Sequence, residues 1–197
     1  MAKVKYGLRK LAYSVVTETT SGGVTTSSYG EIVDVPGAIS INLENNAQKT
    51  VLRADDSDYW VNYGDGSVDG TLTLALVPEK MKEDLGWLKR DDYGIAVTSA
   101  DDFKVEKYVA LMFEFQNDEK ATRWCLYKAS LGRPAIASQT TGENGQIDPQ
   151  TEEISVTAVP RADEDRYTYA YADAKTTSTA YDAWYTNVPT PHFTSGG

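Results

Sequence analysis

Residues 109–129 read VALMFEFQNDEKATRWCLYKA, and apolar side chains recur in them at every second position. The alternating positions are Leu111, Phe113, Phe115, Trp124 and Leu126. Because successive side chains of a strand point to opposite faces of a sheet, this period indicates strands with one buried face. The polar residues 117–120 separate the two runs, so the sequence predicts an antiparallel hairpin here.

The same alternation recurs in three further stretches of the chain. Their apolar members are Ile39, Ile41 and Leu43, then Leu72, Leu74 and Leu76, and finally Ile154 and Val156. The intervening side chains are predicted to face solvent or a partner subunit, and they are Ala38, Ser40, Asn42, Thr71, Thr73, Ser155 and Thr157. We therefore expect a mainly β protein, built as an antiparallel β-sandwich or barrel-like fold.

Two further strands are predicted near the start of the chain, at 11–17 and 31–35. Between them, the Thr/Ser-rich residues 18–28 surround a Gly-Gly pair and predict a hairpin with a long or frayed tip. Pro36-Gly37 is a turn dipeptide. It is expected to join 31–35 to the strand at 38–43 and to fix their register.

One short flanking helix is predicted at 79–88, because Pro78 can open it and Met81, Leu85 and Leu88 share one face. A weaker helix is predicted at 179–185, with Ser178 as its N-cap.

Residues 44–70 lose the alternation and predict a long loop, which we call the arm, ordered by a partner. We expect one domain over 1–189 that includes the arm, and a flexible C-terminal tail over 190–197.

The chain has 197 residues and a formal net charge of -10. A surface that binds nucleic acid needs clustered Lys and Arg, so the charge argues against one and suits a surface to which DNA does not adhere. Cys125 lies within a strand pattern and predicts a buried, inert thiol, in keeping with a reducing cytoplasm. We predict neither a membrane span nor a signal peptide.

The sequence offers little for catalysis or for a cofactor. The single histidine, His192, lies in the C-terminal tail, and one Cys with one His cannot supply a structural zinc site. The Asp-rich parts of the arm do not match the spacing of a calcium loop, and no phosphate-binding glycine loop is present. We expect no enzyme activity, no metal and no cofactor, although a carboxylate pair acting on glycosides stays open.

Acidic and aromatic residues of the arm, together with one tryptophan near the C-terminus, are the candidates for contacts between subunits, because aromatic side chains are enriched at interfaces. These candidates are Asp55, Asp56, Asp58, Tyr59, Trp60, Tyr63 and Trp184. The same abundance of aromatic rings would also suit the alternative of a carbohydrate-binding β-sandwich.

Seven short stretches of the chain form an ordered set: KVKYGL at 3–8, VPGA at 35–38, ALVPE at 75–79, LMFEF at 111–115, KATR at 120–123, DPQTE at 148–152 and AVPR at 158–161. Together and in this order, they resemble the phi13-type family of phage major tail proteins. The resemblance spans about residues 3–187 and leaves out the tip at 19–28 and the tail after Pro189.

The resemblance implies a tail tube protein of a long, non-contractile phage tail. Such a protein would form hexameric rings that stack into a hollow tube, with DNA passing through the lumen without specific binding. Its expected partners are other copies of itself and the tape measure, tail terminator and distal tail proteins. It would be assembled in the host bacterial cytoplasm and reside in the virion tail, without membrane contact.

Overall fold

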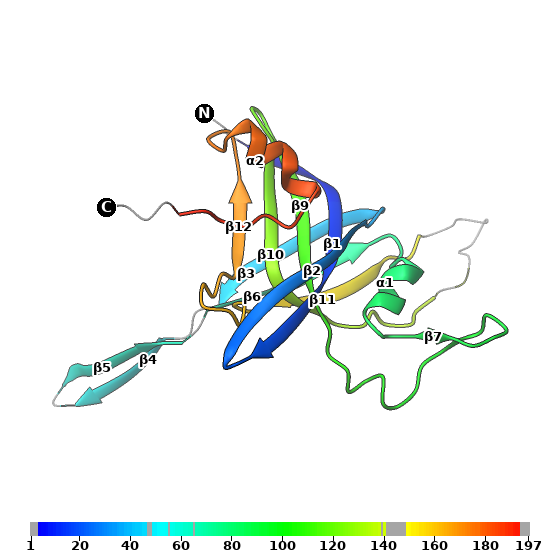
Figure 1. Cartoon of the computed structure of the whole chain (residues 1–197), viewed down its shortest axis with the longest axis horizontal. Helices are drawn as coiled ribbons and strands as arrows, with labels where there is room; N and C mark the ends of the chain where they lie inside the picture. Colours follow the sequence, from blue (N-terminus) through cyan, green and yellow to red (C-terminus); the bar gives the residue numbers. More distant parts are fainter. Residues whose placement is uncertain are drawn as a thin grey trace.

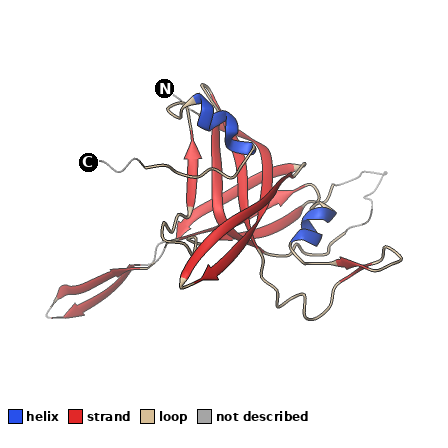
Figure 2. Ribbon diagram, viewed as in Figure 1, coloured by secondary structure: helices blue, strands red, loops and turns tan. Residues whose placement is uncertain are grey.

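The computed structural model describes residues 4–46, 49–54, 56–64, 66–138, 140 and 149–193, and gives only the backbone of 5, 49, 50, 54 and 58–63 (Figure 1). Antiparallel strands dominate the described residues, and the helices among them are short (Figure 2). The mainly β prediction is confirmed.

The principal sheet contains eight strands, all paired antiparallel. Its hydrogen-bonded order is β2 (Val24–Asp34), β1 (Lys5–Ser21), β9 (Tyr108–Asn117), β10 (Thr122–Leu131), β11 (Glu152–Ala158), β6 (Ser67–Leu74) and β3 (Ala38–Asn46), with β12 (Tyr169–Ala172) paired to β10 off this path. Two small hairpins lie outside this sheet, β4 (Lys49–Ala54) with β5 (Ser57–Tyr63), and β7 (Lys89–Arg90) with β8 (Ala96–Val97).

The sheet folds over on itself at β10. This strand pairs with β12 through residues 123–126 and with β11 through 129–131, and its register with β9 shifts between Leu126 and Ala129. Such an irregularity bends a strand and increases its twist. As a result β3 comes into contact with β1, although the two strands are separated along the hydrogen-bonded order.

The first hydrophobic core fills the space between the two halves of the folded sheet. Leu111 and Phe113 of β9 face Leu72 of β6 and Ile154 of β11 across it. Helix α1 (Glu79–Asp84) adds Met81 to this core. Full burial of each such side chain is worth roughly 1.5–3 kcal/mol, so this core supplies much of the stability of the fold.

A second core lies on the other face of β1, β9 and β10. The C-terminal helix α2 (Ser178–Asp182) and the 3₁₀ helix η2 (Ala183–Tyr185) cover it, and Trp184 packs there with Met112 and Cys125. Strand β9 is therefore buried on both faces. The expectation of one buried face is wrong for β9 and β10, but it holds for β6 and β11, whose other face remains open.

The structure corrects several expectations about the connections between strands. The tip at 18–28 is neither long nor frayed, since β1 and β2 continue to a two-residue turn at Gly22 and Gly23, both with positive φ. Pro36-Gly37 does not join a hairpin. Strand β2 pairs with β1 and β3 pairs with β6, so this turn carries the chain from one half of the folded sheet to the other.

Smaller differences concern strand phase and helix length. A register irregularity between Ala38 and Ser40 turns Ile39 outward, and Leu76 is exposed because β6 ends at Leu74. Helix α1 is shorter than predicted, and Gly86 follows it with a φ of 71°, as expected of a residue that ends a helix. The N-cap position of the second helix is Thr177 instead of Ser178, and the Thr177 side chain makes no capping hydrogen bond. Among the described residues, no helix is both long and apolar enough to cross a membrane.

Candidate assembly surfaces

The arm is a β-hairpin and not the structureless loop that its sequence suggested. Strands β4 and β5 pair antiparallel, with Lys49 opposite Tyr63 at one end and Ala54 opposite Ser57 at the other. The hairpin projects away from the folded sheet (Figure 1). A register shift between Leu52 and Arg53 interrupts the pairing. This irregularity is one reason why no simple alternation marked the strands. Leu52 leaves 56% of its surface exposed on the hairpin.

The predicted contact residues of the arm that the structure describes fall in two places. Asp56 lies exposed in the turn of the hairpin with a φ of 59°, a conformation that Asp tolerates better than most residues. The backbone of β5 carries Asp58, Tyr59, Trp60 and Tyr63, while Asp55 lies outside the described residues.

Trp184 differs from the expectation of an exposed interface residue. Only 5% of its surface is exposed, and it packs in the second core of its own chain. Its sequence context, a tyrosine-rich tail, did not reveal that η2 folds back onto β9 and β10.

A network of hydrogen bonds joins the strands at the base of the arm. Asn46 and Ser67 are cross-strand partners where β3 ends and β6 begins. Asn46 Nδ2 and Ser67 Oγ both donate to Asp69 Oδ2, at 3.2 and 2.8 Å. Hydrogen bonds from Ser67, Thr157 and Asn46 lower the pKa of Asp69, which therefore keeps its charge.

The outward face of β3, β6 and β11 is polar and carries no positive charge. Alternation and register place on it Ser40, Asn42, Glu44, Asn46, Ser67, Asp69, Thr71, Thr73, Glu153, Ser155 and Thr157. Its charged side chains are the carboxylates of Glu44, Asp69 and Glu153, and none of these described residues is Lys or Arg. We call this surface the polar face. The sequence predicted its Ser, Thr and Asn members as outward-facing.

A second projection lies between α1 and β9, at the opposite end of the molecule from the arm (Figure 1). Residues 87–107, which we call the flap, contain the short hairpin β7–β8 and several uncovered apolar side chains. The exposed fractions are 91% for Tyr93, 69% for Phe103, 58% for Ile95, 51% for Val105 and 48% for Val97. No motif in the sequence singled out this segment.

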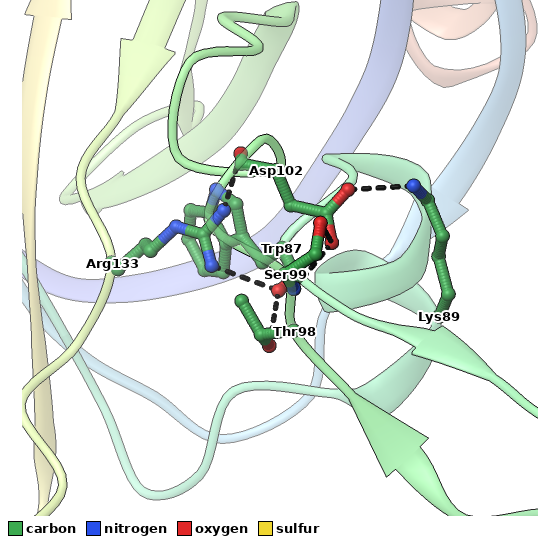
Figure 3. Close-up of polar contacts among 6 residues, drawn as sticks. All are labelled: Trp87, Lys89, Thr98, Ser99, Asp102 and Arg133. Carbon is green, nitrogen blue, oxygen red and sulfur yellow. Dashed lines mark hydrogen bonds and ion pairs between the residues drawn. The ribbon is translucent and has the colours of Figure 1, made fainter.

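The carboxylate of Asp102 joins separate parts of the flap through hydrogen bonds (Figure 3). Lys89 Nζ donates to its Oδ1 at 2.6 Å, and both the backbone N and the Oγ of Ser99 donate to its Oδ2 at 2.8 Å. The hydrogen bond from Lys89, followed by those from Ser99, holds the pKa of Asp102 well below its usual range. Asp102 is only 4% exposed, so these three hydrogen bonds take the place of water around its carboxylate.

Arg133, in the segment that follows β10, fastens the flap to the body of the molecule. Its Nη1 donates to the Trp87 carbonyl at 2.8 Å and its Nη2 to the Asp102 carbonyl at 2.7 Å, as Figure 3 shows. Its guanidinium carbon also lies 4.2 Å from the ring centre of Phe103. The flap is thus held at its first residue, Trp87, and again at Asp102. We call the contacts of Asp102 and Arg133 the latch.

Aromatic rings form a fourth surface feature, where β12 meets β10. The ring of Trp124 lies 5.1 Å from that of Tyr171 and 5.7 Å from that of Tyr169, centre to centre. Both tyrosines are partly exposed, and Trp124 is partly buried against the first core. Trp124 and Tyr169 also line a groove together with Ile41 and Phe115.

The residues considered for chemistry do not form a reaction centre among the described residues. His192 is exposed in the irregular segment after η2, and Cys125 is fully buried, which raises the pKa of its thiol. Within the described ranges, no group of three or more His, Cys, Asp or Glu side chains could hold a metal ion.

The arm, the polar face, the flap and the aromatic rings beside β12 are therefore the candidate functional surfaces. No family model matches this chain, and no curated protein matches it.

Proposed function

We propose that this chain is the structural subunit of a bacteriophage tail tube. In this proposal, copies of the chain assemble into hexameric rings, and the rings stack into the conduit through which DNA is delivered in a long, non-contractile tail. The ordered resemblance to phage major tail proteins over residues 3–187 supports this reading, together with a mainly β fold that exposes a large sheet surface.

The polar face is the observation that carries the proposal. A conduit for DNA must not capture phosphates, and Lys and Arg are the side chains that do so. A wall formed by β3, β6 and β11 would present hydroxyl, amide and carboxylate groups to passing DNA. Its carboxylates would repel the phosphate backbone, and its neutral groups would not displace the counterions that surround DNA.

The edges of the sheet support repeated contacts between copies. Strands β2 and β3 end the hydrogen-bonded order, so each has one edge without a strand partner in the described part of the chain. Open edges favour pairing with another chain, and closure into a ring removes them. The arm supplies a second means of contact, reaching beyond the body of its own subunit.

The function proposed here is structural, with no catalytic step and no cofactor. The proposed partners are further copies of this chain within the tube and, at its ends and inside it, the tail terminator, distal tail and tape measure proteins. The proposed location is the virion tail.

Negative-stain electron microscopy of the concentrated protein, beside size-exclusion chromatography with mass detection, tests the proposal. Hollow tubes or rings of uniform width are the expected result. A protein that stays monomeric at high concentration, and also when seeded with tail-tip preparations, would contradict it.

A carbohydrate-binding module is the second candidate, and one observation favours it. Tyr169 and Tyr171 are exposed beside the partly buried Trp124, and aromatic rings of this kind stack on sugars. A glycan array with the wild-type protein and with Tyr171→Ala separates the two candidates. Binding that this substitution abolishes, in a stable monomer, would support the second candidate against the first.

A further inference from the structure

The flap presents an apolar surface that the described part of its own chain does not cover. Tyr93, Ile95 and Val97 lie on or beside the β7–β8 hairpin, and Phe103 follows on the next turn. Clusters of exposed apolar side chains on soluble proteins mark sites of interaction. The flap therefore has the composition of a contact surface.

The latch gives this surface a fixed shape. Asp102 accepts three hydrogen bonds within the flap, and Arg133 donates to two carbonyl groups at its base. A loop that needed no defined shape would not require a buried carboxylate with matched donors. Pre-organisation of this kind lowers the entropy lost on binding, so it favours an interface.

The fold itself indicates which partner fits. The arm projects from one end of the molecule and the flap from the other (Figure 1). The arm hairpin also exposes an apolar side chain, Leu52, that its own body leaves uncovered. Copies placed end to end would bring the arm of one against the flap of the next, and a contact between two different patches can propagate along an assembly.

We propose that the flap is the receiving surface for the β4–β5 hairpin of a second copy of this chain. This inference rests on the proposed function only in that both require copies to assemble. It adds a specific pair of surfaces, the hairpin around Leu52 and the flap around Ile95, which the proposal of a tube does not itself identify.

Cross-linking between introduced cysteines tests the contact. The native Cys125 is fully buried with a raised pKa, so it does not compete for a thiol reagent in the folded protein. The concentrated double variant Leu52→Cys/Ile95→Cys is treated with a short bismaleimide and analysed on a denaturing gel. Both positions are exposed, so the variant is expected to fold as the wild type does.

Three controls accompany it. Each single variant reports a hairpin–hairpin or flap–flap contact, which would stop at cross-linked dimers. The pair Leu52→Cys/Val24→Cys places the second thiol at the exposed start of β2, at the tip of the β1–β2 hairpin, in place of the flap.

The expected result is a ladder of dimers, trimers and longer species in the Leu52→Cys/Ile95→Cys variant alone. Tubes without a ladder would overturn the inference and leave the proposed function standing, and so would an equal ladder in the Val24 control. A ladder without tubes or rings would support the contact and contradict the tube. Monomers without a ladder would contradict both.

Discussion

Arg123 and Glu114 face one another across β9 and β10, with Arg123 Nε 2.9 Å from Glu114 Oε2. Both side chains are largely buried beneath the C-terminal segment, at 11% and 8% exposure. Arg123 also donates from Nη1 to the carbonyl oxygen of Tyr181 and lies over the Tyr181 ring. One side chain thus joins the central hairpin to the helix that covers it.

Replacing Arg123 with leucine is expected to destabilise the chain by about 2–3 kcal/mol, because it leaves the Glu114 carboxylate buried without its main partner. Lys10 Nζ, 3.7 Å from the same oxygen, limits the loss. Urea unfolding measures the change in the free energy of unfolding. Lys104→Ala, which removes an exposed ion pair with Asp101, is the control and should change it by less than about 0.5 kcal/mol. Equal effects of the two substitutions would contradict this role.

Asp102→Asn is expected to loosen the flap without unfolding the core, because an amide lacks the negative charge that Lys89 Nζ pairs with. The flap contains several trypsin sites, namely Lys89, Arg90, Lys104 and Lys107. Limited proteolysis should therefore cut the variant within 89–107 several-fold faster than the wild type. Asp101→Asn is the matched control, since the neighbouring carboxylate is 86% exposed. Similar cleavage of both variants would refute the latch.

The latch should also resist acid. The pKa of Asp102 is lowered in the folded chain, so the contribution of its carboxylate is fully present above the unfolded pKa of about 3.9 and is lost as the pH falls through the lowered folded value. Hydrogen exchange at the Ser99 amide, which donates to Asp102 Oδ2, measures this. We expect protection relative to a free amide to persist from pH 7 to about 4. Its loss between pH 7 and 5 would show that the carboxylate is not what holds the loop.

The parts of the fold that were predictable depend on local alternation. Strands β6, β9, β10 and β11 carry a period of two that is set by burial on at least one face, and this period is visible in the sequence. The strands of the arm were not predicted, because a register shift follows Leu52 and because the arm projects away from the sheet, where burial does not impose an alternation of apolar and polar side chains.

Features that arise from distant contacts could not be predicted in this way. Strands β2 and β3 are separated because β2 pairs with β1 and β3 pairs with β6. The turn residues Pro36-Gly37 do not determine which strand pairs with which. The latch joins Lys89, Asp102 and Arg133 across 44 positions of sequence, and no spacing rule connects them. The burial of Trp184 likewise depends on η2 folding onto a distant hairpin.

The polar face makes a prediction about reagent size. Ser155→Cys places a thiol at an exposed position of β11, and in the free subunit it should react with both a small maleimide and a large polymer-linked one. In assembled tubes a thiol facing the lumen should still react with the small reagent but be shielded from the large one. Mass spectrometry of the reacted protein measures both.

The two other outcomes of that experiment are equally informative. Reaction with both reagents in tubes would place the polar face on the exterior, and reaction with neither would place it between subunits. Either result would remove the argument that this face is the wall along which DNA passes. Cys125 should stay unreactive throughout, because its thiol is buried.

Removal of the arm is expected to separate folding from assembly. Asn46 and Ser67 are register partners, so residues 47–66 can be replaced by Asn-Gly, a two-residue turn that suits adjacent antiparallel strands. No residue of β4 or β5 whose side chain the structure describes belongs to the first core, so the shortened chain should unfold at nearly the wild-type urea concentration. It should remain a subunit that does not polymerise, as judged by size-exclusion mass and electron microscopy. Leu52→Ser, which keeps the hairpin but removes its exposed apolar side chain, is the matched variant and should weaken assembly less than the deletion does. Tubes of normal width from the shortened chain would show that sheet edges alone suffice to join the subunits.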